Sequence, residues 1–142
     1  MKPKFTTPCF IRKNTPELRR KLEELGYNHR QQWPDKNKDK CRILFVENDS
    51  YFYHYAESRP KVFFYTHIDC GTNETLFLAI AALREDSDKF QWFCDDYCDE
   101  FKSFFLCEYD NVGKHIHEKM DGWDCDGFHK ATIGELINHF KN

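Results

Sequence analysis

The sequence predicts a single α+β domain over residues 1–142, in which a mostly antiparallel sheet of five or six strands packs against three helices. A chain of 142 residues suits one domain. Aromatic residues make up 17% of the chain, and many of them fall in short segments of strand type. These segments alternate with helical ones in the order β-α-β-β-β-α-β-β-α, and a mixed order of this kind is typical of α+β proteins.

The first two elements are an expected strand at 9–12 and an expected helix at 16–25. Thr15 can cap this helix, Pro16 suits its first position and Gly26 suits a left-handed end. Three leucines at spacing i, i+4 and i+7 give the helix one apolar face: Leu18, Leu22 and Leu25.

Residues 28–40 are polar and read as a loop, parts of which form an edge strand in one interpretation. Strands are expected at 41–47, 51–56 and 61–68. Short turns separate them, so they are expected to form an antiparallel meander.

A second helix is expected at 74–84, capped by Thr72 or Asn73. It is apolar on nearly all sides, which predicts that it is buried across the sheet. Further strands are expected at 90–93 and 103–109.

Residues 110–130 show no regular pattern. The final helix begins at a capping box formed by Thr132 and Glu135, and its apolar face contains Ile133, Leu136, Ile137 and Phe140.

The composition predicts a cytoplasmic protein. The N-terminal residues contain no apolar run of secretory type, and no apolar stretch is long enough for a membrane span. The seven cysteines are then expected to be reduced. The net charge of -3 is divided between a basic first half and an acidic second half, which we interpret as attraction between two parts of one fold.

Three tyrosines alternate along the strand at 51–56, so they share one face. If helices cover the opposite face, these rings form an exposed platform for a protein or a small ligand. If helices cover the tyrosines, they belong to the core. The first alternative gives the candidate contact residues Tyr51, Tyr53, Tyr55 and Trp33.

Nucleic-acid binding is a second hypothesis, because cations and rings are interleaved in the first third of the chain. Cations neutralise phosphates and rings stack on bases. The candidate residues are Arg12, Arg19, Arg20, Arg30 and Trp33. Acidic side chains one helical turn away weaken this hypothesis by pairing with several of these cations.

Zinc binding is a third hypothesis, because Cys and His side chains are natural zinc ligands. Two pairs with three intervening residues give a candidate set of Cys94, Cys98, Cys125 and His129. The spacing is wider than in zinc fingers, and core packing of the cysteines is the competing interpretation.

No nucleotide-binding or hydrolase motif occurs, so we predict no cofactor and no enzymatic activity. Cys70 precedes an expected helix, where the helix dipole lowers a thiol pKa, and His67 is close in sequence. Strand alternation separates the two side chains, which argues against a thiol enzyme.

Three segments together resemble small uncharacterised proteins of bacterial phages and mobile elements: CFIRKNTPELRRKLEELGY, ETLFLAIAALRED and HKATIGELINHF. This resemblance covers about half of the chain and contains no catalytic motif. It implies a small accessory protein inside a bacterial cell. We therefore expect a non-enzymatic interaction protein that acts through its aromatic-rich sheet.

Overall fold

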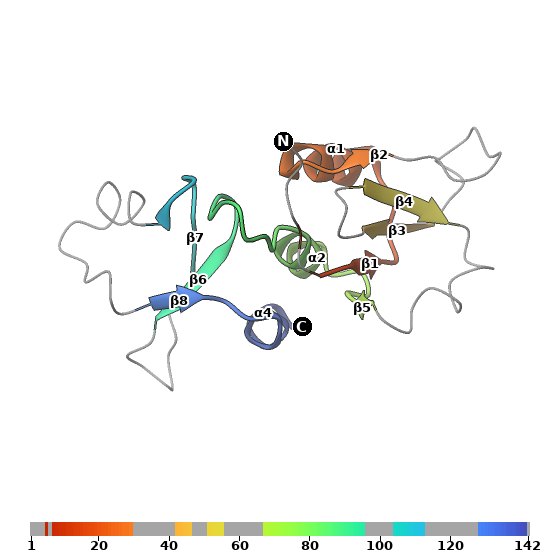
Figure 1. The fold of residues 1–142 in the computed structure, drawn as a ribbon. Coiled ribbons are helices and arrows are strands. Elements are labelled where there is room, and N and C mark those ends of the chain that lie inside the picture. The colour runs from red at the N-terminus through yellow and green to blue at the C-terminus, as the bar shows by residue number, and fades with distance from the viewer. Residues whose placement is uncertain are drawn as a thin grey trace.

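The α+β class is confirmed by the computed structural model, which describes residues 5, 7–29, 42–46, 51–55, 67–95, 104–112 and 128–141, without the side chains of Tyr55 and Asp95. Within these ranges the chain contains three helices and two sheets, and most neighbouring strands are antiparallel (Figure 1). The strands are thus divided between two sheets instead of one.

The first sheet has five strands in the order β2-β4-β3-β1-β5. Its inner strands pair antiparallel, whereas each outer strand runs parallel to its neighbour. The strands are β1 (Cys9–Ile11), β2 (Asn28–His29), β3 (Ile43–Val46), β4 (Tyr51–Tyr55) and β5 (Ile68–Asp69). The expected strand at 61–68 lies outside the described residues except for its end, and that end pairs with β1.

The second sheet has three strands in the order β7-β6-β8, all antiparallel. They are β6 (Trp92–Asp95), β7 (Phe104–Leu106) and β8 (Phe128–Lys130). The prediction that residues 110–130 lack regular structure was wrong at its C-terminal end. A three-residue strand gives little periodic signal, and β8 forms through its pairing with β6.

Helix α1 (Pro16–Leu25) begins and ends where the sequence predicts. The Thr15 side chain accepts a hydrogen bond from the Leu18 N–H group at 3.2 Å. Gly26 has φ 112°, a value that favours glycine because a Cβ would be strained there.

Helix α2 (Glu74–Ala81) lies between the two sheets (Figure 1). Asn73 caps it, and most of its side chains are buried, as its apolar sequence predicts. It ends before the expected position, because Arg84 leaves the helix and forms a β-bridge with Phe5.

Helix α4 (Ile133–Phe140) begins at the predicted capping box of Thr132 and Glu135. Its other end is fixed to α2, because the Asn73 side-chain amide donates to the Phe140 carbonyl. Figure 1 shows α4 beside α2, next to the second sheet.

The main core joins these layers into one apolar cluster. It extends from the helix-facing side of the first sheet through α2 to Leu136 of α4, and Trp92 of the second sheet packs against it. Burial of this continuous apolar surface is the main stabilising contribution to the fold.

The middle residue of the expected tyrosine platform, Tyr53, is buried in the structure. The helices cover the Phe52 face of β4, as one alternative required. On the other face, however, Tyr53 packs with Phe10 and Phe45 and is only 4% exposed, while Tyr51 is partly buried. The side chain of Tyr55 lies outside the described ones. Tyr53 is therefore a core residue and not an exposed contact.

Truncation of Leu22 should show how strongly the fold depends on this core. Leu22 is fully buried, so Leu22→Ala should lower the free energy of unfolding by about 3 kcal/mol. Leu25→Ala, on the same helix but only partly buried, should cost less than half as much. Urea denaturation of both variants measures this difference, and equal losses would contradict the assigned burial.

Candidate metal centre

One row of side chains crosses the second sheet on the face that α4 covers. Cys94 of β6 lies directly opposite His129 of β8 on one side and Phe104 of β7 on the other. Directly opposite residues in antiparallel strands project from the same face of the sheet. The strand register therefore brings the Cys94 sulfur and the His129 ring together.

Helix α4 adds a carboxylate to this pair. After β8, Ala131 continues the pairing through its N–H bond to the Trp92 carbonyl at 2.9 Å, and Thr132 then caps the helix. In the capping box the Glu135 side chain turns back, so that its Oε1 accepts from the Thr132 N–H group at 2.9 Å. The cap thus aims the carboxylate at the sheet.

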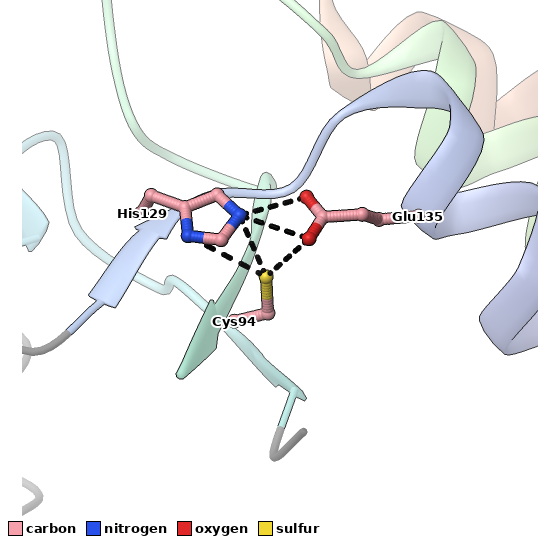
Figure 2. Close-up of side chains that lie close together, drawn as sticks. All are labelled: Cys94, His129 and Glu135. Atoms are coloured by element: carbon pink, nitrogen blue, oxygen red, sulfur yellow. Dashed lines mark hydrogen bonds and ion pairs between the residues drawn. The ribbon is translucent and has the colours of Figure 1, made fainter. Parts of the chain in front are cut away.

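Three different donor atoms converge at this point (Figure 2). The Cys94 Sγ atom lies 3.0 Å from His129 Nε2 and donates to Glu135 Oε2 at 3.2 Å. His129 Nε2 lies 2.8 Å from Glu135 Oε1 and 3.0 Å from Oε2. Among the described residues this is the one group of three or more His, Cys, Asp and Glu donors that can hold a metal ion.

The geometry favours a metal ion over a thiol nucleophile. In a catalytic triad the imidazole uses one nitrogen for the nucleophile and the other for the carboxylate. Here His129 Nε2 is the nitrogen nearest to both groups, 3.0 Å from the sulfur and 2.8 Å from the carboxylate, whereas Nδ1 lies 3.9 Å from the sulfur (Figure 2). Cys94 is also 0% exposed, so a substrate has no access to its sulfur.

The separations between the donor atoms are close to those that zinc requires. Bond lengths of about 2.0–2.3 Å in a tetrahedron place neighbouring donors about 3.3–3.6 Å apart. The three pairs lie 2.8–3.2 Å apart. Small side-chain shifts would thus open the site for the ion, and the mutual hydrogen bonds hold the donors together without it.

Two of the three residues at this site were predicted from the sequence. Cys94 and His129 belong to the predicted zinc set and lie together, whereas Cys98 and Cys125 lie outside the described residues. Glu135 was assigned only to the capping box. The missing signal was the pairing of β8 with β6, which places the first turn of α4 above Cys94.

The described arginines of the set proposed for nucleic-acid binding are not all exposed. Arg12 is exposed and forms an ion pair with Asp69 at 2.7 Å. Arg19 is only 5% exposed, and its guanidinium group bonds to the Asn14 side chain. Arg20 is exposed, while Arg30 and Trp33 lie outside the described residues. Arg19 is therefore not available to a phosphate.

Cys70 and His67 are separated, as strand alternation predicts. Cys70 is buried in the main core, where its thiol points to the Ile68 carbonyl. The His67 ring packs on Phe45, which belongs to the cluster on the other face of the sheet. The described geometry gives no support to a thiol enzyme at Cys70.

A mostly apolar cavity of about 340 Å³ lies between α1, α2 and the second sheet. The carboxylate of Glu74, one of its lining residues, forms ion pairs with two lysines. Its Oε1 atom lies 2.8 Å from Lys21 Nζ, and its Oε2 atom lies 3.1 Å from Lys13 Nζ. Hydrogen bonds from Lys21, then Lys13, hold the pKa of Glu74 below its ordinary value. The lining consists of Lys21, Glu24, Leu25, Glu74, Thr75, Leu78, Ala79, Phe90, Trp92 and Leu106.

The chain matches no protein-family model, no curated protein and no solved structure. The resemblance to phage and mobile-element proteins therefore stays a prediction.

No helix in the described ranges combines the length and the apolar character that a membrane crossing requires.

Two substitutions should separate the contribution of the helix cap to stability from that of the Glu135 charge. Thr132→Ala removes a capping side chain and should lower the metal-free unfolding free energy by about 1 kcal/mol. Glu135→Gln keeps a side chain that suits the capping box, so it should cost less in metal-free protein. Thermal unfolding with a chelator present measures both, and a larger loss for Glu135→Gln would contradict the assigned role of the cap.

The lysine pairs of Glu74 should contribute stability that depends on pH. Because the pKa of Glu74 is lower in the folded state, this contribution is present above its unfolded pKa of about 4.3 and is lost as the pH falls through the folded value. The pairs are largely exposed, so Glu74→Gln should cost only about 0.5 kcal/mol near pH 7. Denaturation between pH 7 and pH 2 should show this difference disappearing in acid, and a constant difference would contradict the assignment.

Proposed function

We propose that this protein binds a divalent transition-metal ion through Cys94, His129 and Glu135, and that zinc is the ion that fits best. The observation that carries the proposal is the convergence of a sulfur, an imidazole nitrogen and a carboxylate oxygen within 4.8 Å of one another. Thiolate and imidazole select zinc over magnesium or calcium, which prefer oxygen ligands.

Charge balance supports an ion at this position. Metal binding deprotonates the Cys94 thiol, and the resulting thiolate together with the Glu135 carboxylate neutralises a dication. Without an ion, a thiolate in this buried position would bear a large desolvation cost. Cys94 therefore binds as a thiolate with the metal and otherwise stays a neutral donor to Glu135.

The role that fits the position is structural. The three ligands come from β6, β8 and the first turn of α4, so one ion joins both strands to the helix. An ion that binds the folded state but not the unfolded chain raises the unfolding free energy by mass action. The ion would stabilise the interface between α4 and the sheet, in agreement with the expectation of a non-enzymatic protein.

Zinc binding by purified protein tests this function. Native mass spectrometry should show one zinc ion per chain, and the thermal unfolding temperature should rise with added zinc. Cys94→Ser should remove the retained ion and most of the shift, because a hydroxyl is a poor zinc ligand.

Cys107→Ser is the matched control. Cys107 is also a buried thiol near the second sheet, but it donates to the Tyr109 carbonyl and not to the cluster. This variant should bind zinc like the wild type. A wild-type protein without zinc, or equal zinc binding by Cys94→Ser, would contradict the proposal.

A further inference from the structure

His139 lies one helical turn beyond Glu135 on α4. Residues four apart on a helix lie on the same side, with Cβ atoms about 5–6 Å apart. The Glu135 carboxylate lies above Cys94 and His129, whereas the His139 ring stacks on Phe104, with ring centroids 3.9 Å apart. Helix α4 thus crosses the row of side chains from β8 towards β7.

The strand register places Phe104, on which His139 stacks, beside the ligand Cys94. Phe104 is the direct cross-strand neighbour of Cys94, and such neighbours have Cβ atoms about 4.5–5.5 Å apart. A ring that stacks on Phe104 therefore lies one side chain away from Cys94. His139 is exposed, so burial does not oppose a rotation of its ring towards the sulfur.

We propose that His139 is the fourth ligand of the metal ion, an inference that rests on the proposed function. Its ring nitrogen would complete a tetrahedron with Cys94, His129 and Glu135. The donors would be one thiolate, one carboxylate and two neutral imidazoles, and this set balances the charge of a dication. Glu135 and His139 would then fix both turns of α4 to the sheet.

Two variants separate ligation by His139 from its packing. His139→Phe keeps an aromatic ring on Phe104 but removes both nitrogens, whereas His139→Ala removes the stacking as well. Each variant is titrated with zinc by calorimetry and with Co²⁺ by absorption spectroscopy, beside wild-type protein. Cys98→Ser and Cys125→Ser test the two other ligands that the sequence suggests.

We expect His139→Phe and His139→Ala to weaken zinc binding to a similar extent, at least about tenfold, and to shift the Co²⁺ absorption bands. Both cysteine variants should bind like the wild type. Wild-type affinity and an unchanged Co²⁺ spectrum in His139→Phe would overturn the role of His139 while leaving the three-ligand site intact. Weaker binding by Cys98→Ser or Cys125→Ser, with His139→Phe unchanged, would overturn it as well. A wild-type protein that binds neither metal would overturn the proposed function itself.

Discussion

The capping box at the start of α4 is the interaction on which the candidate site depends most. Thr132 and Glu135 satisfy each other's backbone N–H groups, and this exchange turns the Glu135 carboxylate towards the sheet. The Glu135 side chain therefore makes two kinds of contact. Its Oε1 atom accepts a hydrogen bond from the Thr132 N–H group, and its Oε2 atom accepts one from the Cys94 thiol. The cap thus directs this acidic side chain towards the buried Cys94.

The apolar core places α4 where the cap can act. Helix α2 is buried between the sheets, and α4 packs on it through Leu136 and is tied to it by the Asn73 amide. Trp92 also packs against Phe140, with ring centroids 5.1 Å apart. Hydrophobic burial sets the position of the helix, and the short polar contacts then set the direction of the ligands.

The local signals in the sequence predicted the helices well. Thr15 and Gly26 mark the ends of α1, and Thr132 with Glu135 marks the start of α4, because caps act through neighbouring backbone groups. The predicted end of α2 at residue 84 was wrong, because Arg84 forms a long-range β-bridge with Phe5 and is not part of the helix.

Long-range strand pairing explains what the sequence did not reveal. The division into two sheets and the strand β8 depend on partners far away in the chain. The same pairing brings Cys94 and His129 together across 35 positions. Cys94 and His129 could therefore be predicted as zinc ligands from their residue types. The role of the Glu135 carboxylate could be recognised only from the folded structure. The burial of Tyr53 could not be predicted for the same reason, since the alternation of side chains along a strand does not show what covers each face of the sheet.

X-ray absorption at the zinc edge of the zinc-loaded protein is the direct test of whether Cys94 binds the ion. Ligation by Cys94, histidine and Glu135 predicts a first shell with one sulfur at about 2.3 Å and nitrogen or oxygen ligands at about 2.0–2.1 Å. The sulfur contribution should disappear in Cys94→Ser. A shell of nitrogen and oxygen alone in the wild type, a shell dominated by several sulfurs, or no retained zinc would contradict it.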